Sequence, residues 1–237
     1  MSSAQVDHLV VVAASLDEGV AWCERVLGIT PGPGGEHPLM GTHNRLFSVA
    51  GPAFARSYFE IIAIQPGVTP TRPAGKHRWF DMDDVLLQAR VAQDGPQLVH
   101  FVASVPGVAT AVKALAAQGL DRGAVVQASR QTASGLLSWR ITVRDDGQRL
   151  FYGTLPTLIQ WGEAGEDPVQ AAHPLDAMPA SGVTLQALQA SHPRPEQLQA
   201  AYDAIGLADV AVVQGTPNLV ATLHTPLGLV QLESKGL

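Results

Sequence analysis

Three side chains in this sequence have the chemistry of a catalytic or metal-binding centre, although they lie far apart along the chain. His8 precedes the apolar run Leu9–Ala14, His100 stands third in a similar run, and Glu60 lies among apolar neighbours. Burying an unpaired carboxylate is costly, so Glu60 needs a partner. Two imidazoles and one carboxylate can hold zinc or non-haem iron and leave coordination positions open. A satisfied core histidine is the alternative, but packing gives no reason for one to recur in the same register.

A second group of polar residues is predicted to bind a substrate. His43, Asn44 and Arg45 follow a loop rich in proline and glycine, Thr30–Gly41, which also carries His37. Because side chains alternate along a strand, His43 and Arg45 share one face. An arginine there can bind a carboxylate through two hydrogen bonds, and His37 can close over it from the loop. Ordinary surface placement is the alternative for this group.

Two tryptophans and four further histidines complete the candidates. Trp139 and Trp161 are predicted to line the concave face of a second sheet, where Trp139 can contact a substrate. Core packing is the alternative for both. The other histidines have no identifiable partner and are interpreted as surface or loop residues, namely His77, His173, His192 and His224.

The elements that must position these residues form a repeated pattern. Val6–Ile29 is predicted to be a strand followed at once by an amphipathic helix, with Ser15 or Asp17 as its N-cap and a glycine stop. Leu98–Leu120 repeats this order, and Gly182–Leu207 is a weaker third copy. The period of roughly 85–95 residues is far longer than that of solenoid repeats, so it indicates duplicated small domains.

Strand-like runs follow each helix, two in the first unit and three in each of the others, and the order βαβββ is predicted three times in a fold of class α+β. The runs are Thr42–Ala50 and Arg56–Ile64 in the first unit, Ala124–Arg130, Gly135–Val143 and Leu155–Trp161 in the second, and Val210–Val213, Leu219–His224 and Gly228–Leu232 in the third. The predicted boundaries are 1–70 for the first unit, 71–97 for a linker with a short helix, 98–165 for the second unit, 166–181 for a second linker, and 182–237 for the third unit.

Composition excludes several classes of protein. The 237 residues are 46% hydrophobic with a mean hydropathy of +0.12, and no apolar run approaches the ~18 residues that span a bilayer. The net charge of −6, without a stripe of lysine and arginine, argues against a nucleic-acid surface. The N-terminus lacks a signal-peptide pattern, and the single Cys23 allows no intrachain disulfide. These features predict a cytoplasmic globular protein with no membrane partner.

The segments DHLVVVAASLDEGVAWCERVLGI, HPLMGTHNRLFSVAG and YFEIIAI resemble the vicinal oxygen chelate superfamily. Within it the chain resembles the glyoxalase-like domain branch, whose relatives include glyoxalases, bleomycin-resistance proteins and extradiol dioxygenases. The resemblance implies that two units pair into a curved sheet around a cavity, with a divalent metal held by His8, Glu60 and His100. The fourth ligand position then falls at Gln160 or, as second choice, Thr157, and neither is a usual metal ligand.

The resemblance implies a metal-dependent lyase, isomerase or dioxygenase that acts on a small oxygenated molecule, with Glu60 as a catalytic residue. The metal would be zinc, iron, manganese or nickel. The alternative is a small-molecule-binding or resistance protein of the same fold without catalysis, and a purely structural module comes third. The third unit has no imidazole between Thr184 and Gln186, where alignment on its helix places the equivalent of His8. It is therefore predicted to be structural, packing on the other units or forming a homodimer.

Overall fold

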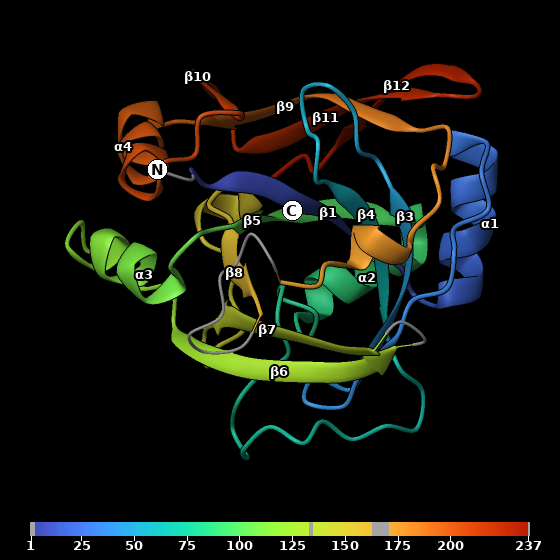
Figure 1. The fold of residues 1–237 in the computed structure, drawn as a ribbon, viewed down its shortest axis with the longest axis horizontal. Coiled ribbons are helices and arrows are strands. Elements are labelled where there is room, and N and C mark those ends of the chain that lie inside the picture. The colour runs from blue at the N-terminus through green and yellow to red at the C-terminus, as the bar shows by residue number, and fades with distance from the viewer. Residues whose placement is uncertain (1–2, 133–134, 163–170, 237) are drawn as a thin grey trace.

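The computed structural model of the protein describes residues 3–132, 135–162 and 171–236 (Figure 1). In this part of the chain the order βαβββ occurs three times, as the sequence predicts. The first unit consists of β1 (Gln5–Val12), α1 (Leu16–Leu27), β2 (Glu36–His37), β3 (Thr42–Ser48) and β4 (Tyr58–Ile64). After α2 (Val85–Asp94), the second consists of β5 (Gln97–Ser104), α3 (Val108–Ala116), β6 (Ala124–Thr132), β7 (Gly135–Val143) and β8 (Thr157–Trp161). The third consists of β9 (Thr184–His192), α4 (Pro195–Ile205), β10 (Ala211–Gln214), β11 (Asn218–Thr225) and β12 (Gly228–Glu233).

The first two units share one curled sheet of eight strands in the order β2-β3-β4-β1-β5-β8-β7-β6. Strands β1 and β5 run antiparallel at its centre and join the two units. Each unit pairs its first strand in parallel with its last, β1 with β4 and β5 with β8. The predicted α+β fold, with two units joined in a curved sheet, is therefore confirmed, and Figure 1 shows β6 and β7 curving beneath β1 and β5.

The third unit keeps the order of elements but pairs its strands differently. Its sheet runs β10-β9-β11-β12, so the parallel partner of its first strand is β10 and not the last strand, β12. This sheet lies against the outer face of the large sheet, above β1 and β5 in Figure 1. The Tyr202 hydroxyl donates to the Thr154 carbonyl across this interface at 2.5 Å. Of the two predicted arrangements, the structure has the one in which the third sheet packs within the chain.

Each face of the large sheet has its own core, because side chains alternate along its strands. On β4, Phe59 and Ile61 pack outward, whereas Tyr58 and Ile62 belong to the inner cluster, as the alternation in the sequence predicts. Helix α1 covers the outer face closely, since a Cβ on Gly19 would lie 2.4 Å from the Ile61 side chain. The helix begins at its Ser15 cap and ends at Gly28, whose φ is 72°.

The loop predicted at Thr30–Gly41 differs from expectation, because it contains β2, which pairs with β3 through Glu36–His43 and His37–Thr42. A two-residue strand is too short to leave a pattern in the sequence. The linker predicted at 71–97 contains α2, which Asp84 caps. Of the predicted unit boundaries, residues 163–165 of the second unit and 166–170 of the second linker lie outside the described residues. No described helix has the length and hydropathy that crossing a membrane requires.

Candidate functional site

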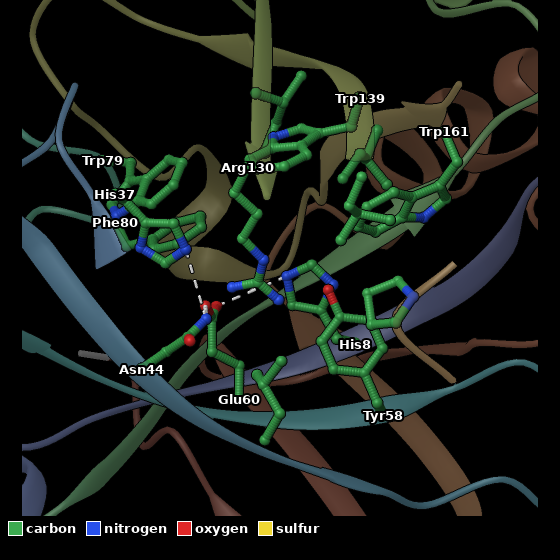
Figure 2. Close-up of a pocket in the computed structure, with 15 residues that line it drawn as sticks. His8, His37, Asn44, Tyr58, Glu60, Trp79, Phe80, Arg130, Trp139 and Trp161 are labelled. Carbon is green, nitrogen blue, oxygen red and sulfur yellow. Dashed lines mark hydrogen bonds and ion pairs between the residues drawn. The ribbon is translucent and has the colours of Figure 1, made fainter. Parts of the chain in front are cut away.

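The concave face of the large sheet encloses a small cavity (Figure 2). Its free space is about 40 Å³, room for a few water molecules. The walls combine aromatic side chains with a polar floor, the aromatic members being Tyr58, Trp79, Phe80, Trp139 and Trp161 and the polar ones His8, His37, Asn44, Glu60 and Arg130. Because the free space is this small, a larger ligand either extends out of the open side of the cavity or displaces one of these side chains.

A bulge in β1 places two polar residues together at the cavity. Val6 pairs with Ala103 and His8 with Val102, so Asp7 is an extra residue opposite β5. Bulges re-aim side chains and occur often beside active sites. The same irregularity precedes His100, because the pairing jumps by one residue at Val99 on β5. The histidines therefore recur at equivalent positions of two bulged strands.

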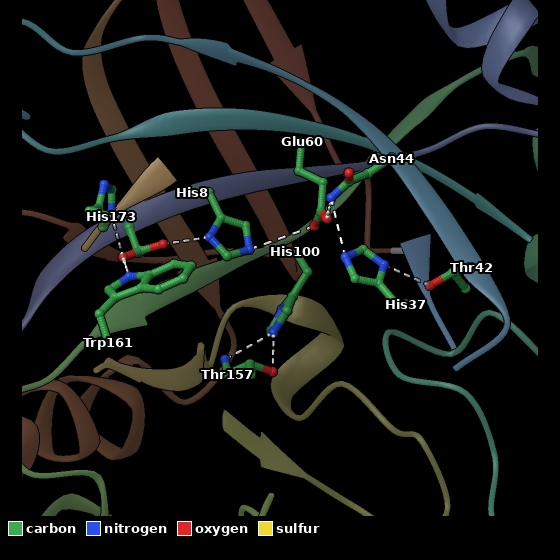
Figure 3. A network of polar contacts seen from close by, with 10 residues as sticks. His8, His37, Thr42, Asn44, Glu60, His100, Thr157, Trp161 and His173 are labelled. Carbon is green, nitrogen blue, oxygen red and sulfur yellow. Dashed lines mark hydrogen bonds and ion pairs between the residues drawn. The ribbon is translucent and has the colours of Figure 1, made fainter. Parts of the chain in front are cut away.

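Asp7 is the centre of a buried hydrogen-bond network. Its partners His8, Trp161 and His173 are labelled in Figure 3. One of its carboxylate oxygens accepts from His8 Nδ1 at 2.7 Å, and the other accepts from Trp161 Nε1 at 2.7 Å and His173 Nε2 at 3.3 Å. Burial raises the pKa of Asp7, but the hydrogen bonds from His173 and His8 outweigh it and hold the pKa well below its ordinary value. Asp7 is therefore a carboxylate, which accepts the Nδ1 hydrogen of His8 and orients the ring so that Nε2 faces Glu60.

Glu60 lies beside His8, with its Oε2 3.6 Å from His8 Nε2. Asn44 Nδ2 donates to the other carboxylate oxygen at 2.6 Å, and Asn44 Oδ1 accepts from the backbone N–H of Gly35 at 2.7 Å. Tyr58 stacks on the His8 ring with centroids 4.5 Å apart. One Glu60 oxygen is thus fixed by an amide, while the other is directed to His8.

His37 closes the polar floor on the side of β2. Its Nδ1 lies 3.1 Å from Thr42 Oγ1, and its Nε2 lies 3.4 Å from Asn44 Nδ2. Burial, together with the positive charge of Arg130, lowers the pKa of His37 to about 3. His37 is therefore neutral near pH 7, so Nε2 accepts from Asn44 and Nδ1 donates to Thr42.

His100 makes a different set of contacts from His8. Its Nδ1 lies 2.7 Å from the Gly153 carbonyl, and its Nε2 accepts from the Thr157 backbone N–H at 3.0 Å. Burial and the nearby Arg122 hold the pKa of His100 well below its ordinary value. Both ring nitrogens of this fully buried, neutral imidazole are thus already engaged.

Strand register identifies the residue of the second unit that corresponds to Glu60. Val10, two residues after His8, pairs with Glu60, and Val102, two residues after His100, pairs with Thr157. The sequence favoured Gln160 for this position, which is wrong. Gln160 Oε1 instead accepts from the backbone N–H of Val108 at the start of α3. The second unit thus pairs its histidine with a hydroxyl, where the first unit pairs its own with a carboxylate.

These contacts test the ligand set that the resemblance implies. His8 and Glu60 are adjacent, but His100 uses both nitrogens on Gly153 and Thr157. Among the described residues no three His, Cys, Asp or Glu side chains are grouped so that they could hold a metal ion. The donors therefore do not fit the implied centre of two imidazoles and one carboxylate.

The other predicted site residues divide between the two faces of the sheet. His37, Asn44 and Trp139 line the cavity. His43 and Arg45 do not, because they alternate with Asn44 along β3 and lie on its other face, away from the lining. The prediction that they bind substrate from this strand therefore has no support in the geometry.

Two of the histidines interpreted as surface or loop residues are buried. His173 contacts Asp7 and, with Asp176, caps the short helix η2 (Pro174–Ala177). His192 accepts from the backbone N–H of Arg194 and packs on Phe151. Their partners are distant or local loop residues that give no periodic signal. The exposed positions of His77 and His224 match the prediction.

Sequence reasoning missed Asp7 and Arg130. The signal for Asp7 was available, since an acidic residue beside His8 at the start of an apolar strand needs a buried partner. Arg130 gave no such signal, because residues 129–132 of β6 are polar at every position, so no apolar neighbour marks Arg130 as the one that faces inward. Nothing in its neighbours shows that its side chain reaches the cavity.

A family model described as a glyoxalase-like domain matches residues 6–206. No curated protein matches. A crystal structure of a hypothetical protein from Staphylococcus aureus is 14% identical, with a TM-score of 0.55, and the match covers 97% of this chain and 85% of that one. That likeness shows the fold alone.

Methylmalonyl-CoA epimerases are also similar. The enzyme from Mycobacterium tuberculosis is 16% identical with a TM-score of 0.38, covering 68% of this chain and 88% of that one. A Streptomyces coelicolor epimerase variant in complex with 2-nitronate-propionyl-CoA is 16% identical with a TM-score of 0.40, covering 67% of this chain and 97% of that one.

Proposed function

The chain belongs to the family of glyoxalase-like domains, and from that premise we propose that it is an enzyme that moves a proton on a small oxygenated molecule. His8 and Glu60 act as the acid–base pair. The observation that carries this proposal is the orientation of His8, whose Nδ1 is held by Asp7 while its Nε2 lies 3.6 Å from Glu60. An imidazole oriented by a buried carboxylate is a recurrent general base.

In the proposed step, His8 Nε2 removes a proton from a carbon next to a carbonyl group. The electron pair of the broken C–H bond forms a C=C bond, and the carbonyl oxygen becomes an enolate oxygen. The proton sits on His8, where Asp7 stabilises the resulting positive charge. It then returns to the substrate from His8, or from Glu60 after passing to Oε2. Return of the proton to the opposite face of the same carbon re-forms the C=O bond and inverts that carbon, which is isomerase chemistry.

The surroundings of the pair support this role. Asp7 and Glu60 are 1% and 5% exposed, so little water screens the interaction of their charges with His8. Asn44 fixes one Glu60 oxygen, and Tyr58 supports the His8 ring by stacking. The step needs only side chains of this chain, and no part of it runs through a metal.

Proton exchange into heavy water tests the proposal. Small 2-oxo acids and hydroxyketones are incubated with the enzyme in D2O, and deuterium at the carbon next to the carbonyl is followed by NMR. The wild type is expected to exceed the buffer rate, whereas His8→Gln and Glu60→Gln fall to it. Arg45→Met, outside the cavity lining, is the matched control and keeps the wild-type rate.

Three outcomes would overturn the proposal. The first is a wild-type rate equal to that of buffer across the substrate panel. The second is exchange that disappears after dialysis against a chelator and returns with one added metal, which would replace this mechanism by a metal-dependent one. Exchange that continues in the His8→Gln variant would remove His8 from the reaction.

A second candidate function is ligand binding without catalysis, which the aromatic walls of the cavity favour. Trp79, Trp139 and Trp161 offer flat apolar surfaces of the kind that hold a ring. Quenching of tryptophan fluorescence by a ligand that undergoes no exchange would support this candidate over the enzyme.

A further inference from the structure

Arg130 extends from the edge of the sheet into the cavity. It lies on β6, the last strand in the sheet order, whereas β2 is the first. The curl of the sheet brings these two ends together, because Arg130 Nη1 lies close to Gly35, the residue before β2. Figure 2 shows its guanidinium directed toward the space beside His8 and Glu60.

No described residue pairs with this guanidinium. The ion pairs among the described residues satisfy other arginines, such as Arg149 with Asp81, Arg144 with Asp146 and Arg78 with Asp83, but none includes Arg130. Its side chain also donates no hydrogen bond within this part of the chain. Its charge nevertheless reaches across the cavity, since it helps to lower the pKa of His37. A half-buried cation without a partner, inside a cavity, is a ready site for an anion.

We infer that Arg130 binds the carboxylate of the substrate, so that the enzyme acts on small carboxylic acids with an apolar or aromatic body. The inference rests on the proposed function and adds its substrate class. A single guanidinium offers a planar fork that matches the two oxygens of a carboxylate. A phosphate group usually takes more donors than one arginine, and Arg130 is the one lysine or arginine among the described residues that line the cavity. Bound in this way, the acid lies beside the His8–Glu60 pair.

Gly35 is part of the same site. A Cβ at this position would lie 2.2 Å from Arg130 Nη1, so any side chain here must displace the guanidinium. The displaced group is the flexible end of a long side chain, so the rest of the fold can stay in place. Gly35→Ala is therefore a way to move the Arg130 guanidinium without removing its charge.

The experiment compares acids with their neutral amides. Binding of butyrate, butyramide, phenylacetate and phenylacetamide is measured by calorimetry and by the shift in Tm. The wild type is expected to bind each acid at least about tenfold more tightly than its amide, as for a charge-assisted hydrogen bond. Arg130→Met abolishes this preference and keeps the amide affinity, Arg130→Lys retains part of it, and Gly35→Ala weakens it. The control Arg45→Met behaves as wild type.

The inference fails if the wild type shows no preference for the acids, if neither acid binds, or if Arg130→Met keeps the preference. His8→Gln separates this result from the proposed function, because that variant should still prefer acids while losing proton exchange. Preference for acids without exchange in the wild type would leave Arg130 as the anion site of a binding protein and would refute the proton transfer alone.

Discussion

Acidification should destabilise this protein in a way that can be traced to one side chain, His37. Its pKa is lowered to about 3 from the ordinary 6.5 by burial and by Arg130, so the folded state keeps the ring neutral. In the unfolded chain the ring takes up a proton below about pH 6.5. Since only the unfolded state gains this proton, stability is complete above pH 6.5, falls as the pH falls, and levels off near pH 3.

The size of the effect follows from the shift. Each pH unit between the two pKa values contributes about 1.4 kcal/mol, so lowering the pH from 7.5 to 5 should remove about 2 kcal/mol of unfolding free energy through His37. His100, whose pKa is also lowered by burial and by Arg122, adds a loss of the same sign. A variant that lacks the His37 ring therefore isolates the part of the pH-dependent loss of unfolding free energy that is due to His37.

Urea unfolding at pH 7.5, 6 and 5 measures this share in wild type, His37→Asn and His224→Asn. The His37→Asn variant should lose about 2 kcal/mol less than wild type over this range, whatever its stability at pH 7.5. His224 is exposed, so His224→Asn should follow the wild type. An identical pH slope in wild type and His37→Asn would refute the account of a neutral, buried His37.

Two further substitutions test the network and the third unit. Asp7 accepts hydrogen bonds from His8, Trp161 and His173, and Asp7→Asn places an NH2 group against at least one of these donors. The variant should lose about 2–4 kcal/mol of unfolding free energy and should show slower proton exchange. An unfolding free energy of Asp7→Asn equal to that of the wild type would mean that the network is not formed. Tyr202→Phe removes the hydrogen bond to the Thr154 carbonyl and should cost about 1 kcal/mol in the same assay, with acid binding unchanged; a loss of binding instead would connect the third unit to the site.

Much of the architecture could be predicted because its causes are local. The helix of the first unit is marked by the Ser15 cap and Gly28, and its start and end agree with the structure. The alternation in YFEIIAI placed Glu60 on the same face as Tyr58 and Ile62, and that face is the concave one. Such signals depend only on residues a few positions apart, so they do not depend on the contacts that the rest of the chain makes.

The third unit shows where local signals stop. Its order of elements was evident, but its strands pair differently from those of the first two units. Its bulge falls at Gln186, which makes Ala187 the equivalent of His8 and corrects the position between Thr184 and Gln186. Pairing partners and bulges depend on contacts between strands, and a helix used as the alignment point cannot fix them.

The sequence by itself determined which polar residues lie on apolar strands, because a strand and its buried face are recognised from the pattern of neighbouring residues. Only the tertiary structure decided which of them meet. The bulge at Asp7 orients His8 toward Glu60, whereas His100 forms hydrogen bonds with Gly153 and Thr157. The curl of the sheet likewise brings Arg130 from one edge to the glycine before the opposite edge. These encounters join residues that are dozens of positions apart, and they are fixed by strand register and sheet curvature, which no short pattern encodes.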